Sequence, residues 1–154
     1  MDIRLKKALQ EDAELIWRMQ ITSFADLLRK YQDFDTNPGN EPVEKIAAEL
    51  SDSHSCFYFI LADGNKVGAI RIVFMNDGIE KRISPLFILP KYRNKGIAQK
   101  AISEAEAIYG NKHWALETVL QEKGNCHLYE KMGYVHTGKT EKINDKLTLI
   151  LYAK

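Results

Sequence analysis

The sequence predicts an α/β (α+β) fold, in which a mixed, mostly antiparallel sheet is flanked by helices. Three observations carry this prediction: apolar and charged residues alternate near the N-terminus, two Asp-Gly steps separate apolar runs, and a long helical repeat follows them. A chain of 154 residues can bury a core without disulfides, and this one has no Gly, Ser or Pro linker that would divide it. We therefore expect residues 1–154 to form a single domain.

Turn and helix signals give the order of the elements. A strand around Ile3 and Leu5 precedes a helix that Asp12 is positioned to cap. The Asp63-Gly64 and Asp77-Gly78 steps predict a three-stranded antiparallel meander. The remaining expected elements are a helix near 43–50, a loop over 31–41, a helix over 97–109, a strand over 114–120, a short helix over 125–132 and a closing strand pair at 134–141 and 147–152.

Composition argues against several classes of protein. Lys and Arg number 22 against 21 Asp and Glu, so the charge of +1 gives no overall attraction for nucleic acid or for anionic lipid. Cys56 and Cys126 lie too far apart in sequence for a metal-ligand spacing, so we expect no metal site and free thiols in the cytoplasm. The charged N-terminus does not resemble a signal peptide, and the apolar run 56–62 is too short to cross a membrane.

A basic segment begins the predicted helix at 97. Residues 91–100 include four basic residues and no acidic one. The first N–H groups of a helix lack internal partners and the helix dipole is positive there, so such a junction favours a phosphate group. Gly96 and Ala98 keep the approach to these amides open. Two alternatives are a solvated basic turn and a helix that Asn94 caps without any ligand.

Two motifs resemble those of the GNAT acetyltransferase superfamily. The first is Arg93-x-x-Gly96-x-Ala98, with the lead-in Pro90-Lys91-Tyr92-Arg93 after an apolar strand. The second is Leu128-Tyr129-Glu130-Lys131-x-Gly133-Tyr134. Neither a Walker loop nor a Rossmann fingerprint is present. The expected order of elements is also similar to that of the superfamily, so the resemblance extends over nearly the whole chain.

The resemblance implies that acetyl-CoA is the co-substrate, with no metal ion. Its pantetheine arm would pair with the backbone of Phe87 and Ile88, in the manner of an added strand. Side chains of Lys91, Arg93 and Lys95 would add contacts or would be solvated. The amides expected to hold the pyrophosphate are those of Asn94, Lys95, Gly96, Ile97 and Ala98.

The resemblance also implies direct attack of an amine on the thioester, so the thiol of Cys126 is not needed as a nucleophile. Tyr129 matches the family tyrosine that donates a proton or a hydrogen bond to the departing sulfur, and we expect it to be the general acid. The alternative is an aromatic side chain that packs against the sheet with a satisfied hydroxyl. An amine must lose a proton before it attacks, which requires a base or a water relay. Glu117 is the preferred base because it interrupts an apolar strand pattern, and the alternatives are that it pairs with an Arg or faces solvent. Glu80 and His113 are further candidates.

One position departs from the family pattern. The family commonly has Asn seven residues before the tyrosine, where this chain has Glu122. Asn125 either takes over a contact with coenzyme A or simply begins the helix.

The family's acceptor site corresponds to residues 24–41 here. The acidic and aromatic residues of this segment either bind a cationic amine or form an ordinary solvated loop: Tyr31, Asp33, Phe34 and Asp35. We expect an N-acetyltransferase that acts on a primary amine of a small molecule. The alternatives are a protein or peptide N-acetyltransferase and a non-catalytic acyl-CoA-binding module. Many relatives form dimers, so a homodimer is left open.

Overall fold

The computed structural model describes all 154 residues. Its strands are β1 (Ile3–Lys7), β2 (Ser55–Ala62), β3 (Asn65–Phe74), β4 (Lys81–Ile88), β5 (Trp114–Val119), β6 (Val135–Lys142) and β7 (Thr148–Ala153). Its helices are α1 (Ala13–Tyr31), α2 (Val43–Ser51), α3 (Ile97–Tyr109) and α4 (Lys123–Lys131). The strands form one sheet in the order β1-β2-β3-β4-β5-β7-β6, and only the β4–β5 pair is parallel. The predicted fold class is confirmed.

Local signals explain most element boundaries. The two Asp-Gly steps fall between β2 and β3 and between β3 and β4, as the hairpin pattern predicts. Helix α3 covers the predicted range and ends at Gly110, whose φ of 91° favours glycine. The segment 31–41 differs from the expected loop, because α1 continues through Tyr31 and a short 3₁₀ turn forms at Pro38–Asn40.

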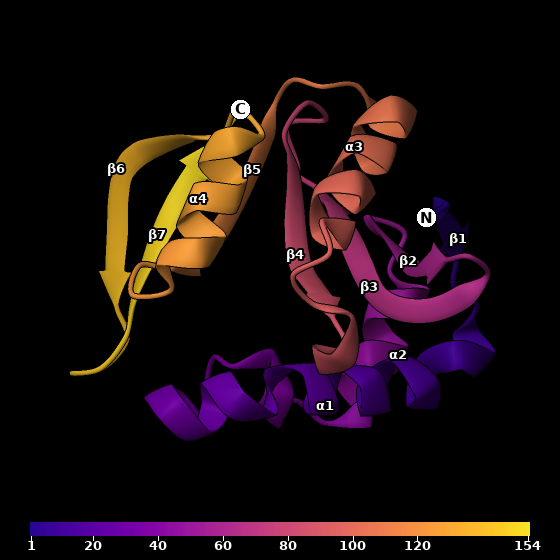
Figure 1. Cartoon of the computed structure of the whole chain (residues 1–154), viewed down its shortest axis with the longest axis horizontal. Helices are drawn as coiled ribbons and strands as arrows, with labels where there is room; N and C mark the ends of the chain where they lie inside the picture. The colour runs from indigo at the N-terminus through magenta and orange to yellow at the C-terminus, as the bar shows by residue number, and fades with distance from the viewer.

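Two apolar clusters cover the two faces of the sheet. One joins α1 and α2 to β2, β3 and β4, and its buried members include Ile16, Ile46, Phe57, Phe59 and Phe87. The other joins the sheet to α3 and α4, and its buried members include Ile70, Ile102, Trp114, Tyr134 and Tyr152. The helices therefore lie in separate layers. As Figure 1 shows, α3 lies with β3 and β4, and α4 lies with β5 and β7.

The sheet divides between β4 and β5. These strands pair only at Lys81–Trp114 and Arg82–Ala115, and beyond these pairs they diverge (Figure 1). The β3–β4 register shifts just after this point, so that Ser84 and Pro85 together stand opposite a single residue of β3. Proline also lacks the N–H that a ladder needs, which suits a strand that loses a neighbour here. The result is a V-shaped gap with one free edge of β4 along its side.

Helix α1 spans the open end of this gap. In Figure 1 it runs beneath both halves of the sheet. Its middle is tied to the end of β4, because the guanidinium of Arg93 donates to the carbonyl of Ser23 and through Nε to that of Ile88 (3.1 Å). Its C-terminal end is tied to the other half, because Nδ2 of Asn144 donates to the carbonyl of Tyr31 at 3.0 Å. Helix α1 therefore connects the two halves of the sheet across the gap.

Candidate active site

The gap between β4 and β5 contains two adjoining hollows. The α3 cleft, with a volume of about 670 Å³, lies between the end of β4, the start of α3 and the face of α4. The β4–β5 pocket, with a volume of about 320 Å³, lies deeper between the two strands and is closed by residues from α1 and the turn that follows it. Five residues line both hollows: Phe24, Leu27, Leu86, Asn125 and Tyr129. A long ligand in the cleft can therefore place one end in the pocket.

Most of the predicted cofactor residues meet in the α3 cleft. Those that line it are Phe87, Ile88, Arg93, Asn94, Gly96, Ile97, Ala98 and Asn125. Lys95 does not line it, and its ammonium lies 5.9 Å from the ring centre of Tyr92. Lys91 lies over the same ring at 5.1 Å, so both lysines extend along the surface of the turn. Neither ammonium group lines the cleft, so the two positive charges act on it only at a distance.

The start of α3 has the open amides that the sequence predicted. Gly96 has a φ of 75° and Asn94 a φ of 63°, so the backbone turns sharply before the helix begins. No side chain caps the helix, and no acceptor within the chain takes the N–H groups from Asn94 to Ala98. A Cβ at Gly96 would meet no atom within 4 Å, so the space beside Gly96 is open. This arrangement can hold an anion.

The side chain of Arg93 has a structural role. Its bonds to the carbonyls of Ser23 and Ile88 use two of its nitrogens and turn the guanidinium toward α1. Two basic residues that the sequence reading did not assign line the cleft instead, His127 and Lys131 on α4. Lys131 stands within the Leu-Tyr-Glu-Lys motif, which was the signal that could have identified it. Basic groups therefore lie on the α4 side of the cleft as well as at the turn.

The free edge of β4 faces the same cleft. Phe87 and Ile88 pair on their other side with β3, opposite Ala69 and Gly68. A Cβ at Gly68 would lie 2.1 Å from the carbonyl oxygen of Phe87, so only glycine allows this close pairing. Because β5 has diverged by this point, the outer edge of β4 remains available for an extended ligand.

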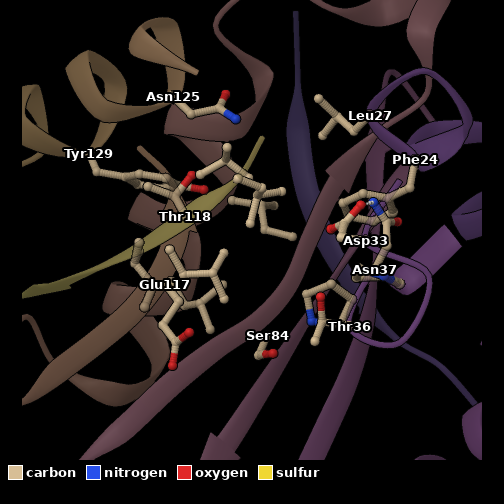
Figure 2. A pocket seen from close by; sticks show the side chains of 18 of the residues that line it. Phe24, Leu27, Asp33, Thr36, Asn37, Ser84, Glu117, Thr118, Asn125 and Tyr129 are labelled. Atoms are coloured by element: carbon tan, nitrogen blue, oxygen red, sulfur yellow. Dashed lines mark hydrogen bonds between the residues drawn. The ribbon is translucent and has the colours of Figure 1, made fainter. Parts of the chain in front are cut away.

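Tyr129 connects the two hollows. It lies on α4, is half-buried, and points into the gap from the same wall as Thr118 (Figure 2). Burial, with a smaller contribution from neighbouring Cys126, raises the pKa of Tyr129 to about 12. The phenol therefore stays protonated over the whole physiological range and can donate a hydrogen bond. Asn125, one turn earlier on α4, directs its exposed amide toward the same gap.

The candidate bases lie in different places. Glu117 lines the β4–β5 pocket, but it is exposed and its carboxylate points away from Tyr129 (Figure 2). The neighbouring Thr118 is buried and lines the pocket, as expected for the opposite face of a strand. Glu80 and His113 do not line the pocket, and Glu80 is paired with Arg82 at 3.1 Å.

Of the four acidic and aromatic residues predicted to bind an amine, Tyr31, Asp33, Phe34 and Asp35, only Asp33 lines the β4–β5 pocket. Asp33 is 7% exposed and faces the gap from the wall opposite Tyr129 (Figure 2). Tyr31 is buried and donates its hydroxyl proton to Glu122 at 2.5 Å. Phe34 and Asp35 are exposed and do not line the pocket.

Glu122 joins α1 to the start of α4. Besides the hydroxyl of Tyr31, it accepts a hydrogen bond from Nζ of Lys30 at 2.9 Å. The hydrogen bond from Tyr31 is the main cause that lowers the pKa of Glu122, and Lys30 adds to it. At the position where the family has Asn, this chain therefore has a carboxylate that is paired with Lys30 and hydrogen-bonded to Tyr31, both on α1.

The structure shows neither a metal site nor a helix that could span a membrane. The chain has no group of three or more His, Cys, Asp and Glu side chains placed to hold a metal ion. None of its helices combines the length and the apolar character that crossing a bilayer requires.

Comparison with known proteins agrees with the fold and with both motifs. The model of the acetyltransferase (GNAT) family matches residues 21–134. The chain belongs to this family. The matched range runs from within α1 to the end of the second motif, so it includes the α3 cleft and Tyr129. The chain is accordingly an acetyltransferase of the GNAT family.

Solved structures with this fold include enzymes with different acceptors. One is a spermidine N-acetyltransferase from Vibrio cholerae in complex with CoA and spermine, with 18% identity, a TM-score of 0.75, and coverage of 97% of this chain and 93% of that one. Another is the PaiA N-acetyltransferase from Thermoplasma acidophilum in complex with coenzyme A, with 18% identity, a TM-score of 0.69 and full coverage of both chains.

A third is an acetyltransferase from Salmonella typhimurium that modifies the N-terminal serine of ribosomal protein L7/L12. Its identity is 10%, its TM-score is 0.75, and the match covers 99% of this chain and 94% of that one. At these identities the likeness establishes the fold and leaves the acceptor open.

Proposed function

We propose that this enzyme transfers the acetyl group of acetyl-CoA to a primary amine of a small molecule by direct attack in a ternary complex. The observation that carries the proposal is the continuity of the two hollows. The α3 cleft, with its open amides, leads past Tyr129 into a pocket of about 320 Å³. A pocket of that size suits a small acceptor better than the open groove that a peptide backbone needs.

The diphosphate of the co-substrate is expected to bind at the amides from Asn94 to Ala98. Gly96 leaves room for it, and Lys131 and His127 line the same cleft, where the ammonium of Lys131 supplies positive charge. The pantetheine arm extends along the free edge of β4 at Phe87 and Ile88, which leads the thioester toward Tyr129. Asn125 lies where its amide can bond the arm at this point.

The reaction then needs no covalent enzyme intermediate. The neutral amine nitrogen forms a bond to the thioester carbonyl carbon, and the carbon–sulfur bond breaks to give an amide and a thiolate. Before this attack, a protonated acceptor amine loses a proton through water to Glu117 at the rim of the pocket. The proton that the nitrogen loses after the attack passes to solvent. The thiolate finally takes a proton from solvent.

Tyr129 acts on the leaving sulfur as a hydrogen-bond donor. Its pKa of about 12 lies above that of an ordinary thiol, about 8.5, so complete transfer of its proton to the thiolate would be uphill. A hydrogen bond to the developing charge costs no such transfer and stabilises the transition state. This assigns Tyr129 a role that does not depend on pH near neutrality.

The test follows thiol release from acetyl-CoA with a panel of small amines and short peptides. Release that requires a small amine supports the proposal. Release with peptides alone would favour a peptide acetyltransferase. Binding of acetyl-CoA with no release above hydrolysis for any acceptor would leave a binding module in place of the proposed activity.

Two free cysteines fit a reducing cytoplasm, so we extend the proposal to a cytoplasmic enzyme.

A further inference from the structure

A buried carboxylate without a charged partner lies in the wall of the β4–β5 pocket. Asp33 is 7% exposed, and its Oδ1 accepts a hydrogen bond from Nδ2 of Asn37 at 3.0 Å. No other side chain bonds to this carboxylate, and no Lys, Arg or His forms an ion pair with it. Burial of a carboxylate costs free energy unless hydrogen bonds and an opposite charge compensate it. The second oxygen, Oδ2, has no hydrogen-bond partner within the chain, and a ligand can supply one.

The charged residues of the pocket indicate which charge a bound ligand group should carry. The only basic residue in the lining is Arg82, and its Nε is already paired with Glu80 at 3.1 Å. The other acidic residue in the lining, Glu117, is exposed to solvent, which screens its charge. Asp33 is thus the buried carboxylate of the pocket that has no ion-pair partner, and its negative charge favours a cation.

Asp33 and Tyr129 stand on opposite walls. Figure 2 shows Asp33 with the turn after α1 on one side of the gap, and Tyr129 with Thr118 on the other. A carboxylate next to the reacting nitrogen would stabilise its protonated form and oppose attack. A carboxylate across the pocket can instead hold a different positive group of the same acceptor while the reacting nitrogen is free to lose its proton.

We propose that Asp33 binds a second cationic group of the acceptor, so that the preferred acceptor is a small compound of the diamine type, with one amine reacting and the other held by Asp33. This inference rests on the proposed function. It goes further in naming the acceptor class and the residue that selects it.

The experiment compares acceptors that differ only in the second charge. The wild-type enzyme and Asp33→Asn are each tested with diaminobutane and diaminopentane against butylamine and pentylamine. We expect wild-type kcat/KM to be higher for the diamine of at least one pair by about 10- to 100-fold, the scale of a desolvated charge pair. Asp33→Asn should reduce this ratio to near one by raising KM for the diamine much more than for the monoamine.

Two controls separate charge from structure. The new Asn side chain can still accept the bond from Asn37, so the turn should stay intact, which thermal unfolding checks. Asp35→Asn removes a charge two residues away that is exposed and outside the pocket, and it should leave the ratio unchanged.

The outcomes separate the role of Asp33 from the proposed acetylation of amines. Equal use of diamines and monoamines by the wild type, or a ratio that Asp33→Asn leaves unchanged, overturns the role of Asp33 while acetylation of amines stands. If no amine is acetylated, the proposed function fails, and calorimetric binding of diaminobutane in the presence of coenzyme A decides the Asp33 site separately. Equal affinity of wild type and Asp33→Asn would then reject it, and a loss of about tenfold or more would support it.

Discussion

The two hollows of the active site are built in different ways. The α3 cleft is made mainly from backbone: open amides at the start of α3 and the free edge of β4. The β4–β5 pocket is made mainly from side chains that arrive from α1, the turn after it, β4, β5, α4 and β7. The backbone groups of the cleft therefore come from one continuous segment, residues 87–98, whereas the pocket depends on how distant segments meet. The cleft suits a co-substrate that is the same throughout a family, and the pocket suits an acceptor that differs between its members.

The largest effect is expected from blocking the cleft. In Gly96→Glu, a negative side chain stands where the diphosphate binds, and the affinity for acetyl-CoA should fall by about 100-fold or more. Titration calorimetry measures this directly. Gly64→Glu is the matched control, because Gly64 also has a positive φ and open space around it but lies in the β2–β3 turn. Undiminished affinity in a folded Gly96→Glu protein would refute the cleft.

A smaller effect is expected where the two hollows meet. Tyr129→Phe removes the hydrogen bond to the leaving sulfur, so kcat should fall by about 100-fold while the affinity for acetyl-CoA changes little. Because burial raises the pKa of Tyr129 to about 12, the wild-type rate should rise with pH as the acceptor amine loses its proton and should show no loss from this phenol below that value. A kcat within twofold of wild type would remove Tyr129 from the chemistry.

At the rim of the pocket the expected effect depends on pH. Glu117→Gln should lower kcat/KM by about tenfold at pH 7, where an amine with a pKa of about 10.4 is almost fully protonated and needs a proton acceptor. Near pH 10 roughly a third of the amine is already neutral, so the defect should shrink. Rate profiles of the two proteins over this range are the measurement. A defect of constant size at every pH would assign Glu117 to binding instead.

The smallest effect concerns the bond that ties α1 to the second half of the site. Tyr31→Phe removes the donor to Glu122 and should lower the free energy of unfolding by about 1 kcal/mol at pH 7. The hydrogen bond lowers the pKa of Glu122, so this stability is present above the pKa of a free carboxyl, about 4.3, and is lost as pH falls through the lower folded value. Denaturant unfolding at pH 7 and pH 3 should show the difference shrink at low pH. A difference that is the same at both pH values would indicate lost packing only.

The sequence predicted the backbone part of the site more fully than the side-chain part. Helical spacing, Gly96 and the absence of an acidic residue in 91–100 are local signals, and they correctly indicated where α3 begins and that its amides are open. The same letters could not show that Arg93 turns toward α1, because that contact depends on Ser23, which lies seventy residues away in sequence.

The alternation of side chains along β5 would have indicated where the side chain of Glu117 points. Glu117 stands between Leu116 and Thr118, which are both buried, so a strand places its side chain on the other face and toward solvent. The pairing of Tyr31 with Glu122, and the absence of a charged partner for Asp33, follow from how α1 crosses the gap. No local pattern in the sequence encodes these contacts, because they depend on the relative position of whole elements.

The most direct test of the central claim is a crystal structure of the enzyme with acetyl-CoA. The account predicts diphosphate oxygens within hydrogen-bond distance of the amides around Gly96, with the pantetheine arm along Phe87 and Ile88. It also predicts the thioester sulfur next to the hydroxyl of Tyr129. A nucleotide bound elsewhere, or a thioester that lies away from Tyr129, would contradict it.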